Sequence, residues 1–147
     1  MNYPKPKFIR YHYEIGFPTQ IGEMCLEFFM NFKEVNTTFH SANQLIDEKK
    51  GAIPLPCKED VMHPSNTLVE IYEQVDEADQ PTRIIQKVLV RVHHLSDRHD
   101  YTYVIARDGY IISAWANAKS DIHRLKSKSV YFSNFHKEDI EYPDVLR

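Results

Sequence analysis

An Asp-Gly pair between two alternating segments is the feature that most constrains the fold. Residues 101–107 and 110–117 alternate apolar and polar side chains, and only Asp108-Gly109 separates them. Asp-Gly is typical of a two-residue type I′ turn, whose twist matches that of the flanking strands. The sequence therefore predicts a tight antiparallel hairpin. The pairs expected on one face are Arg107 with Tyr110, Ile105 with Ile112, and Tyr103 with Ala114, which leaves Thr102, Val104, Ser113, Trp115 and Asn117 on the other, more polar face.

Two further strands are expected before this hairpin. Residues 67–75 are rich in β-branched and apolar residues, residues 76–81 have the composition of a hairpin loop, and residues 82–94 alternate over a long stretch. Successive side chains of a strand point to opposite faces of its sheet. One face of the long strand is expected to carry Ile84, Val88, Val90 and Val92, and the other Ile85, Lys87, Leu89, Arg91 and His93.

Helical spacing dominates the N-terminal half. Apolar residues recur every three or four positions across residues 20–34, and Thr19 before them is a good N-cap. A second helix is expected over residues 38–50, because Gly51 stands where a helix commonly stops. Shorter elements are expected as an edge strand near residues 8–13, a single helical turn at 58–62 and a last short strand at 130–132.

These segments together predict one α+β domain, in which N-terminal helices pack on a C-terminal four-stranded antiparallel sheet. A chain of 147 residues has the usual size of one domain. The expected parts are an extended arm at 1–17, a mainly helical region at 19–62, the antiparallel sheet at 67–117 and a mixed tail at 118–147.

The charge of the chain is distributed unevenly. Residues 83–128 contain nine lysine or arginine residues and four acids, a net charge of +5, so the remainder carries −8 within a total of −3. A basic segment on an acidic chain suits a polyanion as partner, although a solvated surface of mixed charge produces the same pattern.

The sequence also indicates in which cellular compartment the protein is expected. Two cysteines, Cys25 and Cys57, are too few for a disulfide framework, and the first ten residues lack the apolar core of a signal peptide. The longest apolar run is far shorter than a membrane span. We therefore expect a cytoplasmic protein without membrane contact.

The order of the expected elements resembles that of a group of small bacterial toxins. The residues that carry the resemblance are Phe39-His40-Ser41-Ala42-Asn43, Lys49-Lys50-Gly51-Ala52-Ile53, Lys58-Glu59-Asp60-Val61, Pro64, Val69-Glu70 and the hairpin around Asp108-Gly109. The group comprises nucleases with the barnase, EndoU, colicin and RelE type of fold, and the chain is most similar to BrnT-like toxins. Those toxins carry an Arg after the His, where this chain has Gln44 and then Lys49 or Lys50. The resemblance implies a small metal-independent ribonuclease.

Metal-independent RNA cleavage needs a base, an acid and cations that stabilise the phosphorane charge. Histidine suits the first two roles, and the planar fork of arginine matches phosphate. The predicted catalytic residues are His40, Arg91, His93 and Thr102, and the predicted substrate-binding residues are Lys87 and Trp115, which could stack a base. The expected activity is an endoribonuclease that assists attack of the RNA 2′-hydroxyl and needs neither metal nor cofactor.

Other chemistries stay open. A metal site could use His93 or His94 with His99, or Asp121 with His123, but neighbouring strand residues point to opposite faces and a third ligand is missing. Neither cysteine stands in a nucleophile motif. A non-enzymatic alternative is a protein-binding module, an inhibitor or adaptor, that uses a basic aromatic sheet face. Its partner would be a protein or cognate antidote, and the sequence leaves the oligomeric state undetermined.

Overall fold

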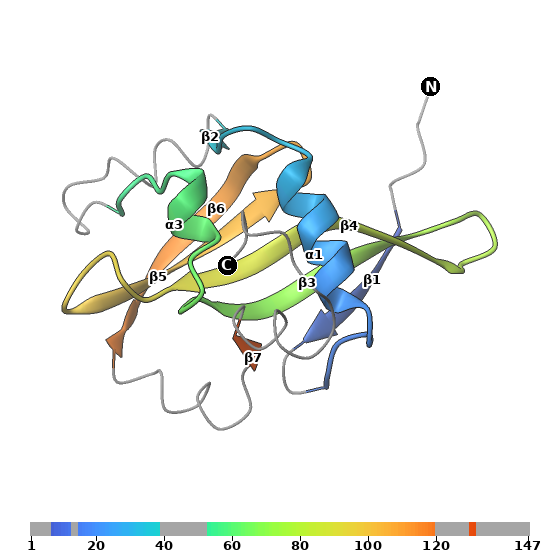
Figure 1. Cartoon of the computed structure of the whole chain (residues 1–147), viewed down its shortest axis with the longest axis horizontal. Coiled ribbons are helices and arrows are strands. Elements are labelled where there is room, and N and C mark those ends of the chain that lie inside the picture. Colours follow the sequence, from blue (N-terminus) through green and yellow to red (C-terminus); the bar gives the residue numbers. More distant parts are fainter. Residues whose placement is uncertain (1–6, 13–14, 39–52, 120–129, 132–147) are drawn as a thin grey trace.

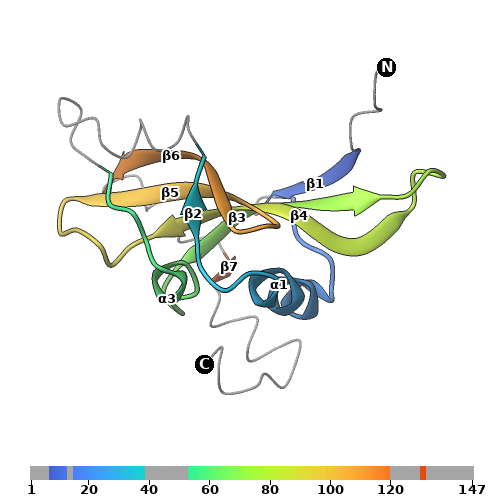
Figure 2. The ribbon, with the colours of Figure 1, turned by 90° about the horizontal axis from the view of Figure 1, so that it is seen from above.

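A curved sheet with two short helices on one face makes up the part of the chain that the computed structural model describes, residues 7–12, 15–38, 53–119 and 130–131 (Figures 1 and 2). The strands are β1 (Phe8–His12), β2 (Asn36–Thr37), β3 (Thr67–Val75), β4 (Pro81–Val92), β5 (His99–Ala106), β6 (Tyr110–Ala118) and β7 (Val130–Tyr131), and the helices are α1 (Ile21–Met30) and α3 (Lys58–Val61). Neither helix is long and apolar enough to cross a bilayer, so the described residues contain no membrane-spanning helix.

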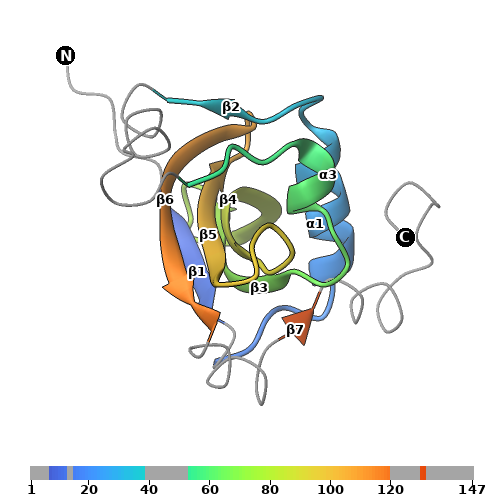
Figure 3. The same ribbon diagram turned by 90° about the vertical axis from the view of Figure 1, so that its left-hand side faces the viewer.

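The seven strands form one sheet in the order β1-β3-β4-β5-β6-β2, with β7 on β3. All pairs are antiparallel except β2, which runs parallel to β6. The sheet curves around the side that carries α1 and α3 (Figure 3). This curvature separates a concave, helix-covered face from the opposite face, which we call the distal face.

The expectation of N-terminal helices on a four-stranded antiparallel sheet is wrong. The expected strands at 67–75 and 82–94 form, and so do the edge strand expected near residues 8–13, as β1, and the last short strand expected at 130–132, as β7. Together with β2, which was not expected, β1 and β7 join the same sheet and raise it from four strands to seven. Backbone pairing between segments far apart in sequence leaves no local pattern, so β2 could not be recognised beforehand. The second helix was expected over residues 38–50, and residues 39–52 lie outside the described part of the chain.

Helix α1 forms from the apolar stripe that the spacing predicts. Its buried side chains include Ile21, Met24, Cys25, Phe28 and Phe29, and they pack on the sheet. The helix ends at Met30 instead of reaching residue 34, and Gln20 instead of Thr19 stands at its N-cap. Asn31 is the C-cap, and its side-chain amide donates to the carbonyl of Arg107 at 2.8 Å, which ties the end of the helix to the β5–β6 turn.

A β-bulge decides which side chains of β4 face the helices. Tyr72 pairs with Lys87 and Glu73 with Ile85, so Gln86 is an additional residue without a partner opposite it in β3. Because of this insertion, Ile85 joins Val88, Val90 and Val92 in the core, whereas Ile84 is only half-buried. The expected grouping of Ile84 with the three valines is therefore wrong.

The Asp-Gly hairpin forms, but its turn differs from the expected one. Tyr103 pairs with Ala114 as predicted, whereas a register shift pairs Ile105 with Ile111 instead of Ile112. Gly109 has a φ of 88°, but Asp108 is not among the residues at positive φ, so the turn is not type I′. In this register Gly109 lies against Phe32 and Glu34, just after the end of α1. A symmetric two-residue turn does not require this contact.

Replacing Gly109 by Ala is expected to lower the free energy of unfolding by about 2 kcal/mol. The positive φ disfavours any side chain, and a Cβ would lie 2.8 Å from both the ring of Phe32 and the carbonyl oxygen of Glu34. Urea denaturation measures the loss. Gly16→Ala is the control, because Gly16 also has positive φ but no atom within 4 Å of its Cβ position, and it should cost less.

Candidate functional site

Three adjacent strands place a row of functional side chains on the distal face. Arg91 of β4 pairs with Thr102 of β5, and Thr102 pairs with Trp115 of β6. Directly paired residues share a face, so the three side chains lie side by side. On the other side of Arg91, Thr67 of β3 continues the row. The period of two along each strand therefore brings together three predicted site residues from separate parts of the chain.

Hydrogen bonds link this row. Arg91 Nε lies 3.4 Å from Thr102 Oγ1, and the Thr102 hydroxyl donates to Asn117 Oδ1 at 2.7 Å. Thr102 is buried, whereas Trp115 is 38% exposed. The row thus combines a fixed polar group with a cation and an accessible aromatic ring.

His93 follows β4 and lies in a second group of polar contacts on the same face. Its Nε2 is 2.7 Å from Thr67 Oγ1, and its Nδ1 is 3.1 Å from Asp100 Oδ2. Lys119 Nζ lies 3.0 Å from the other oxygen of Asp100, whose side chain has no exposed surface. We call these two groups the distal polar network. Its members are Thr67, Arg91, His93, Asp100, Thr102, Asn117 and Lys119.

Burial sets the protonation state of His93. Desolvation lowers its pKa, and the neighbouring Asp100 carboxylate opposes that shift only in part. The imidazole is therefore neutral at pH 7, with one nitrogen able to accept a proton. A neutral imidazole held by a carboxylate is the arrangement that a general base requires.

The order hydroxyl, imidazole, carboxylate also occurs in nucleophilic hydrolases. Here the hydroxyl belongs to Thr67, which has no exposed surface. A nucleophile must reach a substrate carbonyl or phosphorus atom, and Thr67 does not in this arrangement. We therefore interpret Thr67 as a hydrogen-bond partner that holds the imidazole of His93.

Lys87 lies on the same face, toward the opposite end of β4. Its ammonium group stands 4.3 Å from the ring centre of Tyr72 and 6.0 Å from that of Phe8. Four residues separate Lys87 from Arg91, which is about 13 Å along a strand. The two predicted cations therefore mark two separate positions on the distal face.

Of the six predicted site residues, the structure brings Arg91, Thr102 and Trp115 together. It holds His93 in the adjoining part of the network and places Lys87 farther along the sheet, whereas His40 lies outside the described residues. Sequence reasoning missed Thr67, Asp100 and Lys119. Asp100 stands two positions before Thr102, and Lys119 two positions after Asn117, so an extension of the same period would have found them.

The alternative metal ligands do not converge in the described part of the chain. His94 lies 3.1 Å from Asp60, and its ring stacks on that of His63 with the ring centres 4.2 Å apart. These contacts are separate from those of His93. No group of three His, Cys, Asp or Glu side chains among the described residues is placed to hold a metal ion. Asp121 and His123 lie outside those residues.

Neither cysteine is an activated nucleophile. Cys25 is buried in the core, where burial raises the pKa of its thiol strongly. Cys57 is exposed and its thiol contacts a carboxylate oxygen of Asp60 at 3.2 Å. Desolvation is the largest cause that raises the pKa of Cys57, with the side chains of Glu59 and Asp60 adding to it. Both residues are therefore thiols at pH 7.

No protein-family model, no curated protein and no solved structure matches this chain. The resemblance of the sequence to small toxin nucleases therefore stays a prediction.

Proposed function

We propose that the protein binds single-stranded RNA on the distal face and cleaves it there without a metal ion. The observation that carries the proposal is the row of Arg91, Thr102 and Trp115 on three adjacent strands. It places a cation, a polar group and an exposed aromatic ring within one nucleotide-sized area.

Binding follows from the chemistry of that row. The guanidinium of Arg91 matches the geometry of a phosphate group, and the indole of Trp115 offers a ring on which a base can stack. Lys87 adds a second cation on the same face. Single strands suit such a face because their unstacked bases are accessible, whereas the bases of a duplex are not.

Cleavage would use the neutral imidazole of His93. Asp100 lies beside Nδ1, so Nε2 is the nitrogen available to accept the proton of a 2′-hydroxyl. The buried hydroxyl of Thr67 lies at Nε2, so cleavage would require the imidazole to turn away from Thr67 toward the bound strand. Arg91 would stabilise the charge on the phosphorane oxygens. His40 remains the sequence-based candidate for the acid that protonates the leaving oxygen.

A protein partner is the alternative that the structure supports. Phe8, Ile112 and Trp115 are all large apolar side chains with 38% of their surface exposed. Aromatic residues and arginine are enriched at the centres of protein interfaces. Both proposed functions use the same face, so the identity of the bound molecule, RNA or protein, distinguishes them.

Arg91→Ala and Trp115→Ala are each expected to weaken binding of single-stranded RNA about tenfold, since a base stack or a charge-assisted phosphate contact contributes about 1 to 3 kcal/mol. Fluorescence anisotropy with a labelled RNA that carries 2′-O-methyl groups measures binding without cleavage. The same RNA with free 2′-hydroxyls, in EDTA, measures cleavage, which Arg91→Ala should reduce at least about a hundredfold.

Lys33→Ala is the matched control, because it removes one exposed positive charge from the turn after α1. It should leave binding within about twofold, as expected for one solvated charge. Binding without cleavage in EDTA would overturn the enzymatic half of the proposal. No binding to the wild-type protein would overturn the whole of it and favour the protein-binding function.

A further inference from the structure

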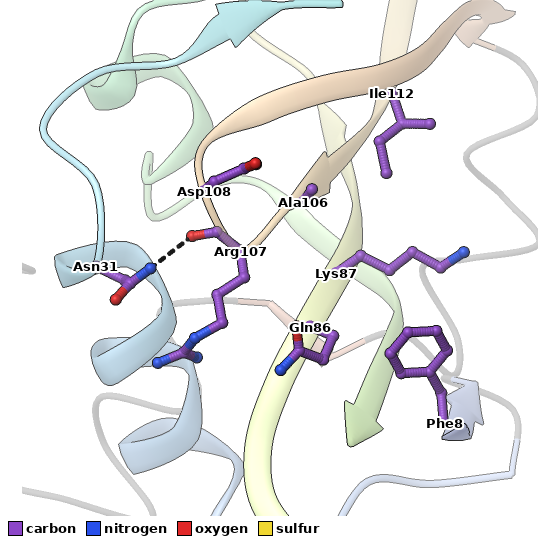
Figure 4. A pocket seen from close by; sticks show the side chains of 8 residues that line it. All are labelled: Phe8, Asn31, Gln86, Lys87, Ala106, Arg107, Asp108 and Ile112. Atoms are coloured by element: carbon purple, nitrogen blue, oxygen red, sulfur yellow. Dashed lines mark hydrogen bonds between the residues drawn. The ribbon is translucent and has the colours of Figure 1, made fainter. Parts of the chain in front are cut away.

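A pocket of about 510 Å³ lies beside Lys87, where the distal face meets the end of α1 and the β5–β6 turn (Figure 4). This volume lies within the range of small-molecule sites. Its lining includes Phe8, Asn31, Gln86, Lys87, Asp108 and Ile112. They come from β1, the end of α1, β4, the β5–β6 turn and β6, so the pocket exists only in the folded sheet.

One wall of the pocket is apolar. Phe8 and Ile112 are partly exposed, and the methylene chain of Lys87 extends between them in Figure 4. The ammonium of Lys87 stands 6.0 Å from the ring centre of Phe8. Such a wall accepts a flat ring on its surface and places a cation at the edge of that ring.

The opposite side of the pocket offers hydrogen-bond acceptors. The amide nitrogen of Asn31 donates to the carbonyl of Arg107, and that of Gln86 donates to Gln74, so their side-chain carbonyl oxygens are the atoms left to bind a ligand. One carboxylate oxygen of Asp108 accepts from the backbone N–H of Tyr110 at 3.2 Å, and the other is a further acceptor in the lining. A ligand that fits these groups carries N–H donors on the edge of its ring.

Only one of the two cations in the pocket wall is suited to a ligand anion. The guanidinium of Arg107 pairs with Glu27 and also donates to the carbonyl of Ile85, so its charge is compensated within the protein. Among the described residues, the ammonium of Lys87 contacts the rings of Phe8 and Tyr72 and forms no ion pair with a carboxylate. A flat ring with N–H donors, attached to an anion, describes a nucleotide.

We propose that this pocket is a second nucleotide subsite, which holds a base of the same RNA strand whose other end lies at Arg91 and Trp115. The inference rests on the proposed function. The base lies against Phe8 and Ile112, and its phosphate faces Lys87. The separation of about 13 Å along β4 corresponds to about four stacked nucleotides at about 3.4 Å each. The two subsites together therefore recognise a strand of about that length.

A length series of oligonucleotides tests the second subsite. The probes are 2′-O-methyl oligoadenylates of two, four and eight nucleotides, which cannot be cleaved through a 2′-hydroxyl. Affinity for the wild-type protein should rise about tenfold or more between the dinucleotide and the octamer, beyond what added length alone contributes. Phe8→Ala should remove that gain and leave dinucleotide binding within about twofold, whereas Trp115→Ala should weaken all three probes.

Lys87→Met gives an independent readout, because it keeps most of the apolar stem and removes the charge. It should reduce the slope of log affinity against log salt by about one for the octamer and leave the dinucleotide slope unchanged. Leu55→Ala is the control for Phe8→Ala, since Leu55 is 59% exposed in the segment that leads to α3. Circular dichroism confirms that each variant is folded.

The outcomes separate this inference from the proposed function. If the wild-type protein binds the octamer and neither Phe8→Ala nor Lys87→Met changes the length or salt dependence, the second subsite is wrong and RNA binding at Arg91 stands. If the wild-type protein binds none of the probes, the proposed function is wrong and the subsite falls with it.

Discussion

Replacing Asp100 by Ala is expected to lower the free energy of unfolding by about 3 kcal/mol. The carboxylate has no exposed surface and lies between His93 and Lys119, at 3.1 and 3.0 Å. Removing one member of a buried ion pair leaves the other without compensation, which commonly costs about 3 to 5 kcal/mol. The lower end applies because Lys119 is partly exposed and can turn toward water. Urea denaturation at pH 7 measures the change.

Asp97→Ala is the matched control, because Asp97 is an exposed acid in the loop that precedes β5 and should cost less than about 0.5 kcal/mol. A double variant, Asp100→Asn with Lys119→Met, tests the origin of the effect. If the ion pair is responsible, the double variant loses less than the sum of the two single losses. Additive losses would show that Asp100 stabilises the fold through other contacts.

Phe28→Ala is expected to lower the free energy of unfolding by about 4 kcal/mol. Phe28 is completely buried in α1, and its ring contacts Phe29 and Phe32 edge to face at centroid distances of 5.1 and 5.8 Å. Deleting a buried phenyl ring removes its transfer free energy and leaves a cavity, which together cost about 3 to 5 kcal/mol. The loss should also remove part of the near-ultraviolet circular dichroism.

Met30→Ala on the same helix is the control, because Met30 is 53% exposed and should cost less than about 0.5 kcal/mol. Equal losses for the two variants would contradict the assignment of the Phe stripe to the core. Phe28→Leu should recover part of the stability, since it refills part of the cavity.

Much of the fold could be predicted because its signals are local. The apolar stripe of α1, the alternation of β3 and β4, and the short turn of α3 each depend on neighbours within a few residues, and each of these elements forms. The ends of the elements were less predictable. Helix α1 ends at Met30 instead of residue 34, and Asn31, the residue that follows it, bonds to Arg107 far along the chain.

The same distinction applies to the candidate site. Period two along a strand predicts that Arg91 and His93 share a face, and hairpin pairing predicts that Thr102 and Trp115 do. The contact between Arg91 and Thr102 needs the register of β4 on β5, which the intervening loop alone does not determine. Asp100 was missed because the strand was expected to begin at residue 101, whereas β5 begins at His99 and includes Asp100.

The sequence by itself determined the elements whose physics is local: the apolar face of α1, the strands from residue 67 onward, and the polar face of the 101–117 hairpin. Only the tertiary structure decided that β2 joins the sheet, that the bulge at Gln86 turns Ile85 into the core, and that His93 meets Asp100. The physical reason is that periodicity reports which way a side chain points relative to its own neighbours. Pairing register and long-range contact depend instead on burial and hydrogen bonding summed over the whole sheet.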